Sequence, residues 1–151
     1  MAKISQVLNQ KSNSSKRSAM ISFRRATLAD RAFLLTLRKN AMDQHLQLAG
    51  IYLDDNAHLK RIDEYFADSH LILIENDSIG LLKLGLFPDK IHVRQFQLLP
   101  AYQGLGIGGR VLDLVKTKAQ EKQIDITLNV LLHNPAKTLY LRHGFMVTER
   151  N

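Results

Sequence analysis

The stretch PAYQGLGIGGR, residues 100–110, carries four of the eight glycines in the chain. Glycine weakens helices and strands alike, so such a cluster indicates that something must approach the backbone closely. The stretch leads into a predicted helix over residues 110–122, so its N–H groups are unpaired donors at the positive end of a helix dipole. Such a site favours anions, phosphate above all, and Arg110 adds a positive charge. The sequence therefore predicts a phosphate-binding loop.

Other interpretations of this glycine-rich loop fit less well. A tight turn needs one or two glycines rather than four. Gly104, Gly106 and Gly109 match the dinucleotide-binding pattern G-x-G-x-x-G, but residues 100–103 separate them from the preceding strand. That pattern also needs an acid at the end of the next strand, whereas Asp125 lies at its start. A Gly-Lys-Ser/Thr triplet, the mark of a nucleotide-triphosphate loop, is absent.

The composition is that of an ordinary soluble domain: 151 residues, 45% apolar and 23% charged. No apolar run approaches the roughly 20 residues that span a bilayer, and the first residues lack a secretory signal, so we expect no membrane association and a cytoplasmic location. The absence of cysteine excludes disulfides, thiolate zinc sites and a cysteine nucleophile. The six histidines show no metal-ligand spacing, so no metal is expected.

The net charge of +7 is concentrated at the N-terminus. Residues 1–20 are rich in Ser, Asn, Gln and Lys and carry four of these charges, which leaves +3 for the rest. We expect residues 1–20 to form a flexible extension and residues 21–151 to form one domain. A nucleic-acid-binding function led by this tail is disfavoured, because the chain lacks aromatics interleaved on a basic face. The remaining charge suits an anionic small ligand or a merely solubilising surface.

Hydrophobic periodicity predicts the element order β-α-α-β-β-β-α-β-α-β, a mixed α/β sheet. The unit over residues 91–131 makes its two strands parallel, because a helix connects them. Asn76-Asp77 is the expected hairpin turn, Asp54 or Asp55 the cap of the second helix, and Asn134 the cap of the last. The expected strands are 21–27, 70–75, 78–87, 91–99, 124–132 and 145–150, and the expected helices reach from about 28 to 45, 55 to 67, 110 to 122 and 136 to 143.

Residues 98–112, LLPAYQGLGIGGRVL, resemble the acyl-CoA loop of the GNAT superfamily, the acetyl-CoA-dependent N-acyltransferases. Gln103, Gly106 and Gly108 fit its pattern Q/R-x-x-G-x-G/A. Downstream, NPAKTLYLRHGF resembles the second motif of the family, through Asn134, Ala136, Leu139, Tyr140, Gly144 and Phe145. The element order agrees over residues 21–151 and the motifs over about 91–149. The resemblance implies the GNAT fold.

In this family the strand before the loop splays from its parallel neighbour, often at a bulge, and the pantetheine arm of coenzyme A pairs with its backbone. The resemblance implies that the N–H of Leu98 donates to the thioester carbonyl, where negative charge develops. Core packing of the Phe96 and Leu98 side chains is compatible with this role. Lys137 would reach the nucleotide phosphates or is a solvated helix lysine. The implied cofactor-binding residues are Phe96, Leu98, Leu99, Gln103, Gly104, Leu105, Gly106, Ile107, Gly108, Gly109, Arg110, Asn134 and Lys137.

Tyr140 and His92 are the implied catalytic residues. A phenol with a pKa of about 10 is protonated at neutral pH, so Tyr140 would protonate the departing coenzyme A thiolate. Without the resemblance, Tyr140 is simply a packed side chain on a short helix. His92 lies near the position where several family members carry a Glu or His base, and an unperturbed His accepts a proton near neutral pH. The alternatives are a solvated strand histidine and a proton relay through water.

The resemblance implies direct transfer of an acetyl group from acetyl-CoA to a primary amine, on a small molecule or a peptide. A non-catalytic acyl-CoA-binding relative is the alternative. Residues 43–55, including His45, Tyr52 and Asp54, are expected to select the acceptor. Family members usually add a seventh strand, whereas this chain stops seven residues after Gly144. Either the acceptor pocket is unusually open, or a partner subunit or the N-terminal extension covers the exposed edge. Because an uncovered edge strand invites pairing, we expect a homodimer.

Overall fold

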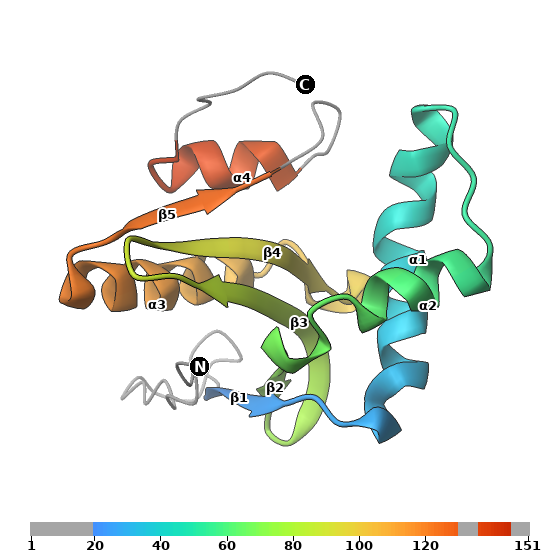
Figure 1. Ribbon diagram of the computed structural model, residues 1–151, viewed down its shortest axis with the longest axis horizontal. Helices are drawn as coiled ribbons and strands as arrows, with labels where there is room; N and C mark the ends of the chain where they lie inside the picture. The colour runs from blue at the N-terminus through green and yellow to red at the C-terminus, as the bar shows by residue number, and fades with distance from the viewer. Residues whose placement is uncertain (1–19, 130–135, 146–151) are drawn as a thin grey trace.

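The computed structural model describes residues 20–129 and 136–145, and a five-stranded sheet lies at its centre (Figure 1). The strands are β1 (Ile21–Arg25), β2 (Ser69–Ile74), β3 (Asp77–Leu86), β4 (Lys90–Leu98) and β5 (Asp125–Leu128). They lie in sequence order, antiparallel except for the parallel pair β4 and β5. The sequence-based prediction of a mixed α/β sheet with one parallel pair is therefore confirmed.

Helices connect the strands where the chain must cross over. Those that the described residues form are α1 (Arg31–Leu48), α2 (Asp55–Asp63), α3 (Ile107–Lys122) and α4 (Ala136–Arg142), with short 3-10 turns between some elements. Asp54 caps α2, because its carboxylate accepts from the N–H of Ala57 at 2.8 Å. None of the helices in the described ranges is long and apolar enough to cross a membrane.

The strands bury side chains on both faces of the sheet. On one face α3 packs through Val111 and Val115 against alternate residues such as Ile72 and Leu82. On the other face α1 and α2 pack against the intervening residues, and the core there consists of Ala26, Leu34, Leu37, Ile62, Leu71 and Leu81. Figure 1 shows α1 and α2 standing together, apart from α3. The sheet therefore separates an α3 side from an α1–α2 side.

Some element boundaries differ from the sequence-based prediction. Helix α1 runs to Leu48 rather than to about residue 45. Helix α2 stops at Asp63 rather than near residue 67, because Glu64 is extended and Tyr65 takes a left-handed φ of 51°. The β2–β3 turn centres on Glu75 and Asn76, both with positive φ, one residue earlier than expected. The predicted extension over residues 1–19, Asn134 and the predicted last strand beyond Phe145 lie outside the described residues.

Candidate active site

Strand β4 carries a bulge at Arg94. Its pairing with β3 joins Lys83 to Gln95 and then Leu84 to Val93, so Arg94 has no residue opposite. Pairing with β5 stops at the same place, since the last pair is Val93 with Leu128. Beyond Arg94, the described residues therefore give β4 a hydrogen-bonded neighbour on its β3 side only.

The backbone of the second half of β4 turns alternate groups toward that open edge. The N–H of Leu99 donates to the carbonyl of Ile79 at 2.8 Å. Residues of an antiparallel strand alternate between hydrogen-bonded and non-hydrogen-bonded pairs, so Leu98 and Phe96 direct their N–H and C=O groups away from β3. Consistent with this geometry, the Gln103 side-chain amide donates to the Leu98 carbonyl at 3.0 Å. The N–H groups of Phe96 and Leu98 thus face the open edge.

The glycine loop connects the end of β4 to the N-terminus of α3. The first N–H of its ladder is that of Arg110, which donates to Gly106 at 3.2 Å. The N–H groups of residues 107–109 precede the ladder and make no backbone hydrogen bond within the described ranges. The N–H of Gln103, expected among the phosphate donors, instead donates to Pro100 at 3.2 Å. Of the amides expected to bind phosphate, that of Gln103 is therefore used within the loop, whereas those of residues 104–109 make no backbone hydrogen bond within the described ranges.

The four glycines of the loop divide into two pairs with different roles. Gly104 and Gly106 have φ of 75° and 81°, which L side chains rarely adopt, and a Cβ there would meet nothing within 4 Å. A Cβ on Gly108 would lie 3.0 Å from Leu139, and one on Gly109 would lie 2.8 Å from the His143 ring. The first pair allows the loop its left-handed turns, whereas the second pair lets α4 approach α3. The sequence analysis had given all four glycines one role.

The remaining predicted cofactor residues take several positions. Phe96 and Leu98 pack on the α3 side, where each comes within 3.9 Å of a Cβ built on Gly108, so their side chains are in the core while their amides face the edge. Leu99 packs on the α1–α2 side. Ile107 is buried, Leu105 is exposed, and Arg110 is half-buried, which lowers the pKa of its guanidinium. Lys137 lies in α4, and Asn134 is outside the described residues.

Tyr140 lies on α4, one residue after the leucine that contacts Gly108. It is 8% exposed, and its ring meets the edge of Phe145 at a centroid distance of 5.8 Å. Burial raises the pKa of its phenol to about 12. The hydroxyl therefore keeps its proton throughout the neutral range.

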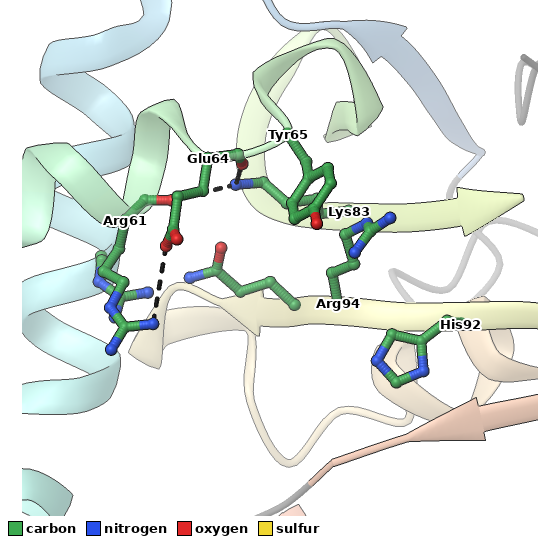
Figure 2. A pocket seen from close by; sticks show the side chains of 8 residues that line it. Arg61, Glu64, Tyr65, Lys83, His92 and Arg94 are labelled. Carbon is green, nitrogen blue, oxygen red and sulfur yellow. Dashed lines mark hydrogen bonds and ion pairs between the residues drawn. The ribbon is translucent and has the colours of Figure 1, made fainter.

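A separate cavity of about 360 Å³ lies on the α1–α2 side of β4 (Figure 2). Its lining residues come from α1, the end of α2, β3 and β4, and none of them is a predicted cofactor-binding residue. The bulge builds one wall: it turns Arg94 and Gln95 to the same face as His92, while Val93 and Phe96 both face α3. The lining residues are Arg38, Arg61, Glu64, Tyr65, Lys83, His92, Arg94 and Gln95.

Lys83 forms the floor of this cavity and is only 3% exposed. Its ammonium group donates to three carbonyls at the end of α2, those of Glu64 at 2.7 Å, Ile62 at 3.2 Å and Arg61 at 3.4 Å. Burial, with help from nearby Arg38, lowers the pKa of Lys83 to about 8. The carbonyls at a helix C-terminus are the favourable partners of a cation, which explains how the group is held there.

The Arg94 guanidinium lines the cavity together with Lys83 and is held by contacts with three residues. Its Nε donates to Asp68 at 3.0 Å, and its guanidinium lies 3.5 Å from the centroid of the Tyr65 ring. A Cβ on Gly85 would lie 2.7 Å from the guanidinium, so the absence of a side chain there makes room for it. Figure 2 shows the Tyr65 ring facing Arg94.

His92 is the one predicted catalytic residue that lines the cavity. Its Nδ1 lies 2.7 Å from the Thr127 hydroxyl, across the β4–β5 pair. Burial, followed by the charges of Arg94 and Lys90, lowers the pKa of its imidazole. The ring is therefore neutral at physiological pH and able to accept a proton.

Three of the residues expected to select the acceptor, Tyr52, Asp54 and Asp55, have other positions. Asp54 is the cap of α2, Asp55 pairs with Lys39 at 2.8 Å, and Tyr52 is 81% exposed. None of them lines the cavity. The cationic lining was missed, although two features of the sequence signal it: a lysine inside the apolar run IGLLKLGLF, and two successive polar residues, Arg94 and Gln95, that break the alternation of β4.

The bulge of β4, the end of its pairing with β5 and the glycine-bearing start of α3 agree with the fold that the resemblance implies. The family model described as an acetyltransferase (GNAT) domain matches residues 39–151. The chain therefore belongs to the GNAT acetyltransferase family. A search of curated proteins found no match.

Solved structures with the same fold include GNAT enzymes of several kinds. PaiA N-acetyltransferase from Thermoplasma acidophilum, in complex with coenzyme A, is 18% identical with a TM-score of 0.68, covering 87% of this chain and 92% of its own. Aminoglycoside N-acetyltransferase AAC(6')-Iy is 18% identical with a TM-score of 0.62, over 91% and 95%. Arabidopsis thaliana Naa50, bound to the bisubstrate analogue CoA-Ac-MVNAL, is 18% identical with a TM-score of 0.62, over 85% of each chain.

Proposed function

We propose that this protein is an N-acetyltransferase that moves an acetyl group from acetyl-CoA directly to a primary amine. One observation carries the proposal: the N–H groups of Phe96 and Leu98 face the open edge of β4, and the glycine loop leads from the end of this strand to the N-terminus of α3. An extended thioester arm needs donors on a strand edge, and a diphosphate needs donors at a helix start. Both kinds of donor are present here, the strand-edge donors for the thioester arm and the helix-start donors for the diphosphate of acetyl-CoA.

The fit of this chain to acetyl-CoA rests on its backbone. The N–H groups of residues 107–109 would hold the pyrophosphate, and the left-handed turns at Gly104 and Gly106 keep side chains out of its way. The Leu98 N–H would donate to the thioester carbonyl and stabilise the oxyanion that forms there. Arg110, Asn134 and Lys137 are the side chains proposed to assist.

The chemical step needs one base and one acid. The amine nitrogen attacks the thioester carbon, the carbon–sulfur bond breaks, and coenzyme A leaves as a thiolate. The nitrogen loses two protons in all, one before the attack and one after it, and the second would replace, directly or through water, the proton that the acid gives to the thiolate. His92, neutral because its pKa is lowered, would take the proton from the ammonium form of the acceptor, directly or through water. Tyr140, whose pKa of about 12 keeps it protonated, would give its proton to the thiolate.

The acceptor would enter from the cavity on the α1–α2 side. This cavity lies against the β4 bulge, so an amine within it would approach the place where the thioester lies. Among the similar structures, one enzyme is named for aminoglycosides and another holds a peptide analogue. Either a small molecule or a peptide end is thus a candidate acceptor.

The test has two stages. Coenzyme A should raise the melting temperature, since a ligand of the folded state alone must do so. Acetyl-CoA with an amine panel should then release free thiol, and Tyr140→Phe should lose most of that release while keeping the thermal shift. Coenzyme A binding without release against any amine would favour the non-catalytic acyl-CoA-binding alternative. No thermal shift at saturating coenzyme A would overturn both.

A further inference from the structure

The cavity beside β4 has an excess of positive charge. Its cationic side chains come from separate elements, α1, α2, β3 and β4, and they face a single carboxylate in the lining, that of Glu64. Glu64 lies 3.6 Å from Arg61 on the exposed side, so it is the partner of that arginine. The cationic residues are Arg38, Arg61, Lys83 and Arg94.

Two of these cations, Lys83 and Arg94, are held in place by contacts within the described residues, and of the two only Arg94 has a carboxylate partner there, Asp68. Lys83 donates only to backbone carbonyls, and the described residues give it no ion pair with a carboxylate. Arg94 uses its Nε for Asp68, and its Nη1 and Nη2 make no hydrogen bond to the described residues. Stacking on Tyr65 and the space over Gly85 hold this guanidinium in place, with one edge left to donate.

The pKa shifts of Lys83 and His92 agree with an excess of positive charge in the cavity. Arg38 and Arg94 contribute to the lowered pKa of Lys83, and Arg94 contributes to that of His92, after burial in both cases. Glu64 and Asp68 act in the opposite direction on Lys83 and do not cancel the shift. The cavity therefore disfavours the binding of a cationic group and favours the binding of an anionic one.

The geometry points to an acceptor that carries an anionic group, a carboxylate or a phosphate, on the same small molecule as its reactive amine. This inference rests on the proposed function of the site. The Nη edge of Arg94 would bind the anion through two parallel hydrogen bonds, and Lys83 would act on it by charge alone, because its own donors are used. The amine would then point along β4 toward His92 and the open edge. A volume of about 360 Å³ suits a small molecule.

The test uses the wild-type protein and three acceptors of equal length that differ in one charge: 4-aminobutyrate, 4-aminobutanamide and 1,4-diaminobutane. We expect kcat/KM to fall in that order, by about tenfold or more from the anion to the amide, with the difference shrinking at high salt. Phosphoethanolamine against ethanolamine forms the phosphate arm. A preference for the phosphate pair alone would identify phosphate as the anion; a preference in the carboxylate series alone would identify carboxylate.

Two variants connect the preference to the cavity. Arg94→Gln removes the donating edge, and it should abolish the anion preference while leaving the coenzyme A thermal shift unchanged. Lys122→Gln, at the exposed end of α3, removes the same charge elsewhere and should leave the preference intact. If Arg94→Gln fails to fold, the wild-type acceptor series and its salt dependence still decide.

The outcomes separate this inference from the proposed function. Thiol release that is equal for the three acceptors, or fastest with the diamine, overturns the inference and leaves the acetyltransferase standing. If no acceptor gives release, the melting temperature in saturating coenzyme A is measured with each compound. A larger shift with 4-aminobutyrate than with its amide then supports anion recognition without catalysis, and equal shifts overturn it.

Discussion

The two sides of β4 offer a ligand different kinds of group: main-chain N–H groups on one side and side chains on the other. The side that faces α3 and the open edge offers main-chain N–H groups, from Phe96 and Leu98 and from the start of α3. The α1–α2 side offers side chains, held by a bulge, a stacked ring and a helix end. Main-chain donors suit the parts that every acyl-CoA shares, whereas the side chains of the cavity would select the acceptor.

That difference suggests that substitutions on the two sides should separate into two kinds of defect. Changes on the α3 side should weaken coenzyme A binding or chemistry for every acceptor. Changes in the cavity should alter the choice and affinity of the acceptor and leave coenzyme A binding alone.

The largest effect is expected for Tyr140→Phe. Removing the proton donor to the thiolate should lower kcat by roughly 10²-fold or more, with little change in the coenzyme A affinity. Steady-state kinetics and calorimetric titration measure the two quantities. An unchanged kcat would exclude Tyr140 as the acid, and an equal loss of coenzyme A affinity would indicate a role in binding.

Gly106→Ala should come next. A side chain at its φ of 81° costs about 1–2 kcal/mol, and the shape of the loop changes, so coenzyme A affinity should fall by about tenfold. Gly50→Ala is the matched control, because Gly50 has a φ of 76° and equally open surroundings but lies between α1 and α2. Both variants should lose similar stability to urea. If both also lose coenzyme A affinity alike, the loop has no special role in binding.

Gly85→Ala tests the cavity side. The added Cβ would lie 2.7 Å from the Arg94 guanidinium, so the guanidinium must shift while it keeps its charge. We expect the KM for the preferred acceptor to rise several-fold while the KM for acetyl-CoA stays constant, because the guanidinium leaves its ring contact. A rise in both constants would contradict the separation of the two sides.

The pH profile should show the smallest effect. Burial and the charges of Arg94 and Lys90 lower the pKa of His92, so the base form persists at neutral pH and is lost only as the pH falls through the lowered value. The acid limb of kcat/KM should therefore have its midpoint below about 6.5. His92→Asn, whose amide can keep the contact with Thr127, should remove this limb and leave the limb due to the amine. A profile unchanged in the variant would assign the base to another group.

The same division between main-chain and side-chain groups explains which features of the site can be predicted from the sequence. The glycine loop and the helix after it are local in sequence, so their pattern predicted both elements, although α3 begins at Ile107 rather than at residue 110. The pattern could not assign Gly108 and Gly109 to packing, because their neighbours lie about 30 residues further along the chain, Leu139 on α4 and His143 just after it. It also ended α2 too late, since the left-handed Tyr65 reflects its position over Arg94 rather than its own preference.

The cavity could not be assembled from the sequence. Arg38, Lys83 and Arg94 lie far apart in the chain, and a bulge of one residue decides which way Arg94 points. Residues 43–55 are predicted to select the acceptor, and the structure adds that Asp54 caps α2 and that Asp55 pairs with Lys39. Which polar residues are already used by the fold is known only from the structure.

Hydrogen exchange of single backbone amides, with and without coenzyme A, tests the central claim most directly. The account predicts that saturating coenzyme A slows exchange at Leu98 and at residues 107–109 by about tenfold or more, because these N–H groups become donors to it. The amide of Gln97 faces β3 and should not change. Coenzyme A that binds while Leu98 and the start of α3 exchange as before would contradict the account.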